Sequence, residues 1–290
     1  MVFIKYEEED DAFFAKEIAN KLCGNYKSNV IVLFTGKMGS GKSYAIMRLA
    51  EQISYYMSLK LKIPQEEIFN MNHIGIMTAK EIERVYEMMD TTTRKVYALD
   101  DIGTFINARK FNSDINISHN DRLQTARPHM HCILYSVPNA RLTDVVLRML
   151  STYVVYMSKP EFDTIGCSVA DIRSIDIRPN GEIWYPRLKN WKGETYYRYL
   201  FSHPKKEWAL EYDKRREIAN DELLAKCRDT VEKSLQKNVH VETQKDKSLR
   251  LHADMLEGKF GDMSFVAICR ANNVSPEYAQ KVVSIAKRIV

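Results

Sequence analysis

The residues best suited to chemistry form a glycine-rich run that follows an apolar segment. They fit the pattern G-x-x-x-x-G-K-[ST] and lead into a helix-like stretch; the set is Gly36, Lys37, Met38, Gly39, Ser40, Gly41, Lys42, Ser43 and Tyr44. Glycines allow successive backbone N–H groups to curl closely around a phosphate. In such a loop Lys42 supplies charge to the β- and γ-phosphates, and the hydroxyl of Ser43 is a ligand for Mg²⁺. The run therefore predicts a site for the phosphates of a nucleotide.

Two adjacent carboxylates end a second apolar segment. Residues 96–99 lead directly into Asp100 and Asp101. A carboxylate at the carboxyl end of a strand beside the phosphate loop can hold Mg²⁺, so we assign Asp100 to the metal together with Ser43. Asp101 stands where ATPases that resemble this loop-and-carboxylate pattern usually place a glutamate that polarises the attacking water, and aspartate is one methylene shorter. These acids predict ATP and Mg²⁺ as cofactors, with Lys42 and Asp101 as catalytic residues.

Further polar residues surround a strand-like run at residues 131–136. The run ends in Ser136, a candidate for contact with the γ-phosphate or the attacking water, with a capped strand end as the alternative. An arginine from a neighbouring subunit can stabilise the charge on a transferred phosphoryl group. Arg148 is our first candidate for this role and Arg141 the second, and for each a surface or structural ion pair stays open as an alternative.

The order of apolar segments predicts an α/β fold. Unbroken β-branched runs indicate buried strands, and apolar residues at helical spacing indicate helices. Strands are expected at residues 29–35, 74–77, 96–99, 131–136 and 153–157, and helices at 11–23, 42–59 and 79–89. Strands that alternate with helices imply βαβ units, so we expect a parallel sheet with helices on both faces.

The remainder of the chain predicts smaller units. An Asn-Gly pair between strand-like runs indicates a β-hairpin insertion within residues 172–201. Residues 205–250 are charged and favour helix, whereas residues 251–290 regain apolar periodicity. We therefore expect a phosphate-loop domain over residues 1–204 with its core at about 29–160, a charged helical connector over 205–250 and a small helical unit over 251–290.

The C-terminal segment resembles a helix-turn-helix. An apolar helix, a short turn and a second helix follow one another, with Ser275 as N-cap and Pro276 at the first helical position. This arrangement leaves three basic side chains for contact with DNA phosphates, namely Lys281, Lys287 and Arg288. Helix pairs of this kind also serve as protein-interaction caps, which is the alternative.

Composition narrows the class of protein. The 290 residues carry 43 Lys and Arg against 38 Asp and Glu, a net charge of +5, which permits a nucleic-acid partner without requiring one. The 5 cysteines have no C-x-x-C spacing, so neither a disulfide framework nor a zinc site is predicted. No apolar run reaches the roughly 18 residues that span a bilayer, and the N-terminus is acidic where a signal peptide is basic. We expect a soluble, cytoplasmic protein.

Taken together, the motifs resemble the additional-strand P-loop ATPases, and within them the FtsK–HerA superfamily with its Zot-like and packaging ATPases. The resemblance rests on FTGKMGSGKSYAIMRLA and RPHMHCILYSVPNARLTDVVLRMLSTYVVYM, and it covers about residues 29–160. It implies a P-loop NTPase fold of the RecA/ASCE type that hydrolyses ATP to ADP and phosphate with Mg²⁺. It further implies a ring, a hexamer by preference, that translocates DNA in genome packaging or transfer with viral or mobile-element partner proteins.

A second resemblance competes with the first. IMTAKEIERVYEMMDTTTRKVYALDDIG is similar to the DnaC/IstB helicase-loader group of AAA+ proteins, which would imply a role in replication or transposition. Residues 174–201 favour a strand hairpin where AAA+ proteins carry an all-helical lid, so we prefer the FtsK–HerA resemblance. A nucleotide-dependent switch without motor activity is the third hypothesis.

Overall fold

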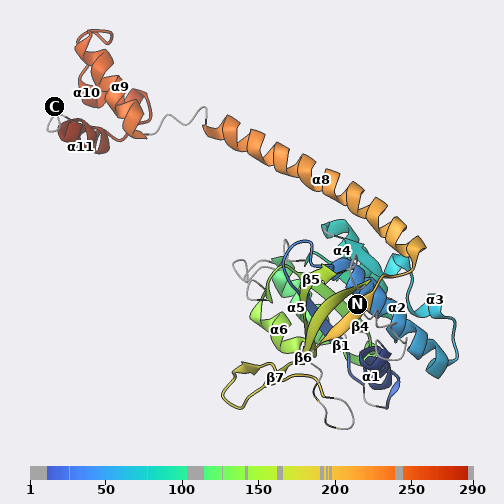
Figure 1. Cartoon of the computed structure of the whole chain (residues 1–290). Helices are drawn as coiled ribbons and strands as arrows, with labels where there is room; N and C mark the ends of the chain where they lie inside the picture. Colours follow the sequence, from blue (N-terminus) through green and yellow to red (C-terminus); the bar gives the residue numbers. More distant parts are fainter. Residues whose placement is uncertain are drawn as a thin grey trace. The chain divides into compact units, whose positions relative to one another are not determined.

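A seven-stranded sheet forms the centre of the fold (Figure 1). In this computed structural model the described residues are 12–25, 27–76, 78–102, 114–125, 127–140, 143–161, 166–189, 193, 195, 198–238 and 244–286. The sheet strands are β1 (Val30–Thr35), β2 (Ile74–Ile76), β3 (Val96–Asp100), β4 (Cys132–Val137), β5 (Tyr153–Glu161), β6 (Cys167–Ser174) and β9 (Tyr199–Ser202). A separate two-stranded sheet pairs β7 (Asp176–Ile177) with β8 (Ile183–Trp184).

The strand order explains how distant residues come together. The order is β2-β3-β4-β1-β5-β6-β9, with parallel pairing from β2 to β5 and antiparallel pairing of β6 and β9. β4 lies between β1 and β3, so it separates the strand before the phosphate loop from the strand that ends in the carboxylates. This mostly parallel α/β sheet and its hairpin were predicted from the sequence. The strands β6 and β9 were not, because neither is a continuous apolar run.

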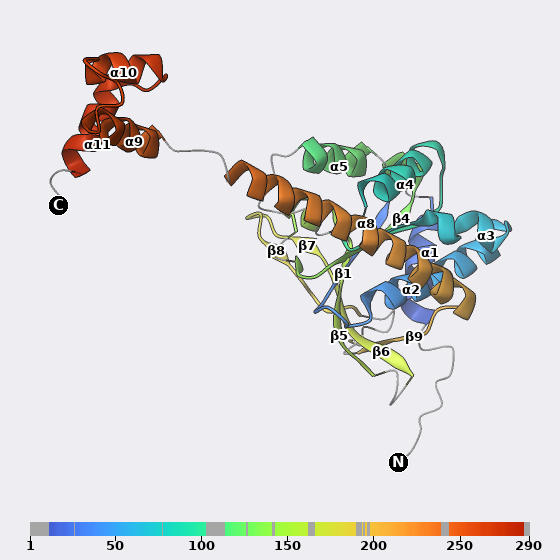
Figure 2. The same ribbon diagram turned by 90° about the horizontal axis from the view of Figure 1, so that it is seen from above.

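Helices cover both faces of the sheet (Figure 1 and Figure 2). The helical segments before the C-terminal region are α1 (Ala12–Cys23), α2 (Lys42–Leu61), α3 (Gln65–Ile68), the 3₁₀ turn η1 (Met71–His73), α4 (Ala79–Thr91), α5 (Asp114–Thr125), the 3₁₀ turn η4 (Arg127–His129) and α6 (Val145–Leu150). All six residues of β1 are buried, and the first five, which are apolar, alternate between two apolar clusters. Val32 packs in the cluster that contains α1 and α2, whereas Leu33 packs in the cluster that contains α4, α5 and α6.

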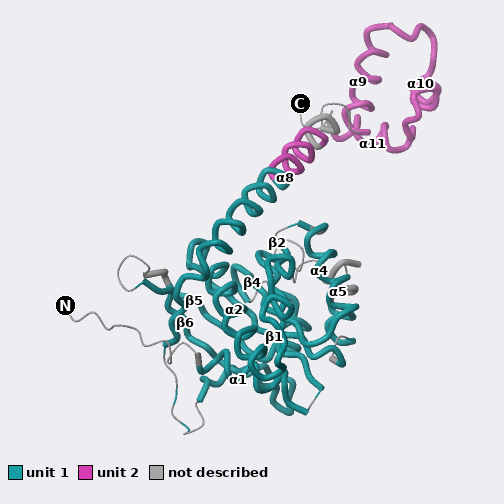
Figure 3. The backbone as a smooth tube through the Cα atoms, turned by 90° about the vertical axis from the view of Figure 1, so that its right-hand side faces the viewer, with its two compact units in different colours: residues 1–223 teal, residues 224–290 magenta. Residues whose placement is uncertain are grey.

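Four helices follow β9 among the described residues: α8 (Lys206–Asn238), α9 (Gln244–Leu256), α10 (Phe265–Ala271) and α11 (Pro276–Ala286). The chain divides into two compact units, residues 1–223 and 224–290, and the boundary falls within α8 (Figure 3). The sequence-based division into residues 1–204, 205–250 and 251–290 stays a prediction. Among the described residues, no helix combines the length and apolar character needed to cross a bilayer.

The first part of α8 packs against the sheet domain through residues spaced along one face of the helix. Tyr212 and Ala219 are buried in the cluster that contains α1 and α2, and Trp208 packs against the same cluster. The apolar residues Ile218, Leu224 and Val231, which form the more obvious stripe in the sequence, are exposed. Tyr212, a tyrosine among charged residues, therefore contributes to the packing of this helix against the sheet domain.

The second unit forms a small core of its own from α9, α10 and α11. Its buried residues are Leu251, Ile268, Cys269, Val274 and Ala279. The N–H of Tyr278 donates to the hydroxyl of Ser275 (3.4 Å), the N-cap interaction expected at the start of α11.

Two buried histidines make stability depend on pH. Burial lowers the pKa of His73 and of His131 to about 4. The Nδ1 of His131 accepts from the N–H of Lys95 (3.2 Å), and its Nε2 lies 3.0 Å from the carbonyl oxygen of Met89. A second ring proton would therefore face a donor at Nδ1. The same histidines take up a proton near pH 6.5 in the unfolded chain. The free energy of unfolding is therefore highest above pH 6.5 and falls toward pH 4, by on the order of 2–3 kcal/mol for each histidine.

Urea unfolding at pH 7.5, 6 and 5 measures this effect. In the His131→Gln variant the decrease in the free energy of unfolding between pH 7.5 and pH 5 should be about half of the wild-type decrease, because glutamine does not titrate. The exposed His203 provides the matched control, His203→Gln, which should keep the wild-type slope. Equal slopes in all three proteins would contradict the assignment to buried histidines.

Candidate nucleotide site

The phosphate loop lies where β1 ends and α2 begins. Gly41 adopts a left-handed conformation (φ 82°) immediately before the first residue of α2. At Gly36 a Cβ atom would lie 2.8 Å from the carbonyl oxygen of Met157 and 2.8 Å from the hydroxyl of Ser40, so only glycine fits there. The first N–H groups of α2 have no partner within the helix and face the loop. They favour the binding of an anion at this position.

Lys42 is held at the loop by the loop's own backbone. Its Nζ donates to the carbonyl oxygens of Gly36 (2.9 Å) and Lys37 (3.0 Å). The residue is 8% exposed, and burial lowers the pKa of its ammonium group. Lys37, by contrast, is exposed. A buried cation that is hydrogen-bonded to neutral carbonyls is stabilised further by an anionic ligand.

The carboxylate of Asp100 contacts the phosphate loop at Ser43. The hydroxyl of Ser43 donates to Oδ2 of Asp100 at 2.9 Å. The hydroxyl of Ser136, on the intervening strand β4, donates to Oδ1 of Asp100 and accepts from the N–H of Asp101 (2.8 Å). Ser136 is fully buried, and its hydroxyl orients the side chain of Asp100 and the backbone of Asp101. This contact was not foreseen, because the sequence analysis gave Ser136 the γ-phosphate or water as its partner.

Asp101 has an unusual backbone conformation, with φ at 52°. Aspartate tolerates this left-handed region better than most residues with a side chain. Burial and the neighbouring Asp100 carboxylate raise the pKa of Asp101. The conformation offers a physical reason for an aspartate at a position where a glutamate was expected.

The arrangement fits a magnesium ion. Asp100 is 1% exposed, and its carboxylate accepts hydrogen bonds from three uncharged hydroxyl groups, those of Ser43, Ser136 and Tyr212. A buried carboxylate with such partners is stabilised by a nearby cation. Mg²⁺ prefers oxygen ligands and keeps several of its waters. Ser43 and Asp100 would hold it beside the phosphates.

These features occur together in one architecture: a G-x-x-x-x-G-K-[ST] loop between strand and helix, and a carboxylate two strands away across β4. The fold is that of a P-loop NTPase.

Comparisons with known proteins give only distant likenesses. No protein-family model matches the sequence, and no curated protein matches it. Among solved structures, the N-terminal domain of zonular occludens toxin from Neisseria meningitidis is 16% identical, with a TM-score of 0.34, over 58% of this chain and 99% of that one. The genome packaging NTPase B204 from Sulfolobus turreted icosahedral virus 2, in complex with ATP-gammaS, is 11% identical (TM-score 0.35; 55% and 97% covered). The FIGL-1 AAA domain in complex with ADP is 14% identical (TM-score 0.35; 54% and 52% covered).

Helix α8 contributes residues to the P-loop site that the sequence analysis missed. A cavity of about 320 Å³ is lined by Met38, Gly39, Ser40, Gly41, Lys42, Ser43, Tyr44, Asp101, Pro138, Asp213 and Arg216. Arg216 lies 3.3 Å from Oδ2 of Asp101, and the Tyr44 hydroxyl donates to Asp213 (2.8 Å). The Tyr212 hydroxyl donates to Oδ2 of Asp100. These residues lie more than a hundred positions from the carboxylates, and only the helical spacing of Trp208, Tyr212 and Ala219 hinted at a packed face.

The predicted arginines and DNA contacts lie elsewhere or outside the described residues. Arg148 lines a second cavity of about 510 Å³ with Gly36, Lys37 and Tyr185, a different cavity from the one that Lys42 lines. Arg141 is outside the described residues, as are Lys287 and Arg288. Lys281 is exposed on α11. The roles predicted for these residues stay predictions.

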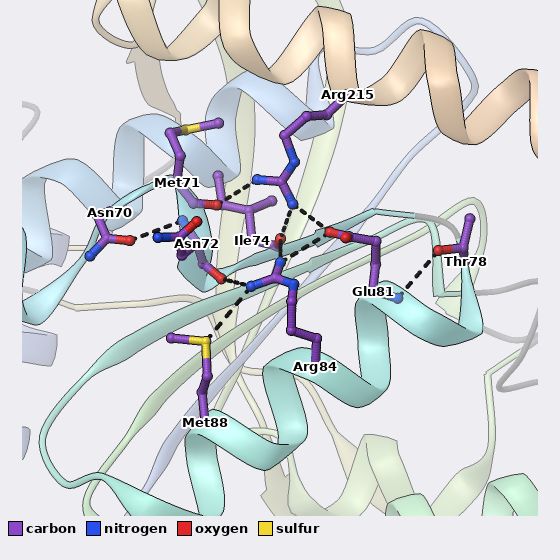
Figure 4. Close-up of polar contacts among 9 residues, drawn as sticks. All are labelled: Asn70, Met71, Asn72, Ile74, Thr78, Glu81, Arg84, Met88 and Arg215. Carbon is purple, nitrogen blue, oxygen red and sulfur yellow. Dashed lines mark hydrogen bonds and ion pairs between the residues drawn. The ribbon is translucent and has the colours of Figure 1, made fainter.

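Arg215 fixes α8 to the edge of the sheet domain (Figure 4). Its Nη1 donates to the carbonyl oxygen of Met71 (2.6 Å), and its Nη2 donates to that of Ile74 (2.8 Å). The same guanidinium pairs with Glu81, which also binds Arg84 (3.0 Å). The anchor lies one residue before Arg216, so it holds the part of α8 that lines the P-loop cavity.

The Arg215→Ala variant should destabilise the first unit by about 1–3 kcal/mol, because two backbone carbonyls and Glu81 lose a charged donor. Urea unfolding followed by Trp fluorescence measures the loss. Arg228→Ala, an exposed arginine of the same helix, is the matched control and should stay within about 0.5 kcal/mol of wild type. Equal stabilities of the two variants would show that Arg215 does not anchor the helix.

Proposed function

We propose that this chain binds Mg-ATP in the P-loop cavity and hydrolyses it to ADP and phosphate. The observation that carries the proposal is that Lys42, Ser43 and Asp101 line one cavity. Asp100, far from Ser43 in the sequence, accepts a hydrogen bond from the Ser43 hydroxyl at 2.9 Å. Lysine charge, helix N–H groups and a metal-binding carboxylate are the parts that phosphoryl transfer requires.

Each residue has a defined part in the proposed reaction. Lys42 leaves the carbonyl oxygens of the loop and donates to the β- and γ-phosphates. Ser43 and Asp100 hold Mg²⁺, which neutralises phosphate charge when bound. Asp101 accepts a hydrogen bond from the attacking water and orients it toward the γ-phosphate. Ser136 holds the Asp100 carboxylate and the backbone N–H of Asp101 in place.

We further propose that hydrolysis drives movement along DNA in a homo-oligomeric ring, preferably a hexamer, in genome packaging or transfer. Support comes from the helix-turn-helix order of α10 and α11 and from the exposed Lys281. A ring would multiply the weak DNA contact of each subunit, since linked contacts add avidity. Such binding should weaken steeply as salt rises. A helicase-loader ATPase of the DnaC/IstB type is the alternative.

The deciding experiment measures the ATPase rate with no DNA, with single-stranded DNA and with double-stranded DNA. A motor or a loader should be stimulated by one of them, whereas a switch should not. Lack of stimulation by either DNA would refute both DNA hypotheses and leave the hydrolysis proposal standing. Deletion of residues 251–290 should weaken DNA binding and leave the basal rate intact; a truncated chain that binds DNA as well as the full chain would refute a DNA role for that unit.

Ring assembly has its own test, which follows from the cavity that Arg148 lines. If Arg148 reaches the nucleotide of a neighbouring subunit, mixing Lys42→Ala with Arg148→Ala subunits should restore part of the activity through mixed interfaces. Arg122→Ala removes an arginine that pairs with Glu83 and lines neither cavity. This variant is the matched control partner and should be active alone. A mixture no more active than its inactive components would refute a trans role for Arg148.

A further inference from the structure

Helix α8 places two side chains on the carboxylates that the proposed reaction needs. Tyr212 donates to Oδ2 of Asp100, and Arg216 pairs with Oδ2 of Asp101 at 3.3 Å. The residues are four apart, so they lie on the same face of the helix. Arg215, which lies between them in sequence, fixes this turn to β2 and α4 (Figure 4). The turn is thus held at the site by contacts that do not involve the cavity.

The Tyr212 contact competes with a metal ion for one oxygen atom. Oδ2 of Asp100 already accepts from Ser43 and from Tyr212, which uses both of its lone pairs. Ser43 can keep its hydrogen bond while its own lone pair faces a metal, because a hydroxyl is both donor and acceptor. The Tyr212 hydroxyl also donates its proton to Oδ2, so this proton lies on the lone pair that a metal would use. Metal ligation at Oδ2 therefore requires Tyr212 to leave.

The Arg216 contact similarly involves an alternative partner. Arg216 and Lys42 line the same cavity, so the guanidinium faces the space that we assign to phosphates. A guanidinium binds phosphate as well as carboxylate, and phosphate oxygens carry more charge. While Arg216 pairs with Asp101, the guanidinium occupies the carboxylate oxygen that would otherwise accept a hydrogen bond from water. Transfer of the guanidinium to phosphate would free the carboxylate for water.

We propose that Tyr212 and Arg216 exchange partners when Mg-ATP binds. Tyr212 breaks its hydrogen bond to Asp100, and Oδ2 of Asp100 then binds the metal. Arg216 leaves Asp101 and binds the terminal phosphate, as a cation supplied by the same chain. This inference rests on the proposed function, namely nucleotide binding in the P-loop cavity. It makes α8 the part of the chain that responds to the bound nucleotide.

Nucleotide-binding measurements on the intact chain test the Arg216 part. The Arg216→Ala variant should bind ATP roughly 10- to 100-fold more weakly, with ADP affinity changed by less than about threefold, because only ATP carries the γ-phosphate. Arg216→Lys should recover part of the loss, and the exposed Arg228→Ala should match wild type. An equal change in ATP and ADP affinity would overturn the phosphate contact.

Magnesium titrations test the Tyr212 part. At fixed ATP, Tyr212→Phe should lower the Mg²⁺ concentration that gives half-maximal nucleotide binding by roughly tenfold, because the competing hydroxyl is gone. Tyr55→Phe, an exposed tyrosine of α2, is the control and should match wild type. An unchanged or higher Mg²⁺ requirement in Tyr212→Phe would overturn the exchange. If the wild-type chain bound no nucleotide at all, the proposed function itself would fail, an outcome distinct from these.

Discussion

Replacement of Lys42 by alanine is expected to abolish nucleotide binding at working concentrations, with a loss of affinity of roughly 100- to 1,000-fold. The buried ammonium group now bonds only two backbone carbonyls, Gly36 and Lys37, and phosphates would give it charged partners instead. Alanine removes that charge from the centre of the loop. Equilibrium titration with ATP and with ADP measures the effect, which should be large for both nucleotides.

The matched control for this variant is Lys37→Ala. Lys37 belongs to the same loop, but its side chain is exposed, so its removal should change nucleotide affinity by less than about threefold. A Lys42→Ala protein that bound and hydrolysed ATP at the wild-type rate would show that the loop does not hold the phosphates. A Lys37→Ala protein as defective as Lys42→Ala would show that the exposed lysine is also a ligand.

Asp101→Asn should separate binding from turnover. Asparagine also tolerates the left-handed backbone of this position (φ 52°), so the loop should keep its conformation. The variant lacks a carboxylate to orient water and should lose roughly 100- to 10,000-fold in hydrolysis rate while it still binds Mg-ATP. Steady-state phosphate release together with nucleotide titration measures both quantities.

The pH profile adds a second readout for Asp101. Burial and Asp100 raise the pKa of Asp101, so the wild-type rate should fall as pH drops through that raised pKa and should recover above it. Asp121→Asn, an exposed acid of α5, is the matched control and should keep both rate and profile. Normal turnover by Asp101→Asn would show that another group orients the water.

Local sequence patterns were enough to predict the centre of the fold. The loop from Gly36 to Ser43 and the acids after residues 96–99 each follow from neighbouring residues, because strand, turn and helix signals are short in range. The structure brings Ser43 within 2.9 Å of Asp100 through parallel strands whose carboxyl ends meet at one edge.

Contacts between distant segments could not be predicted in this way. Tyr212 and Arg216 lie in a charged stretch whose obvious apolar residues, such as Ile218 and Leu224, turn out to be exposed. The surface of the sheet domain decides which face of α8 packs. That surface forms only when distant segments fold together, so local sequence patterns do not reveal it. Ser136 was singled out as a polar strand end, but only the position of β4 between β1 and β3 brings it to the Asp100 carboxylate and the Asp101 N–H.

Phosphate release from ATP by the purified full-length chain, with Mg²⁺ and with or without DNA, tests the central claim most directly. The account predicts many turnovers per chain for the wild type, and release at least about 100-fold slower by Asp101→Asn at the same nucleotide occupancy. A wild-type chain that is saturated with Mg-ATP, with DNA present, and yet releases no phosphate would contradict the claim that this P-loop site is an ATPase.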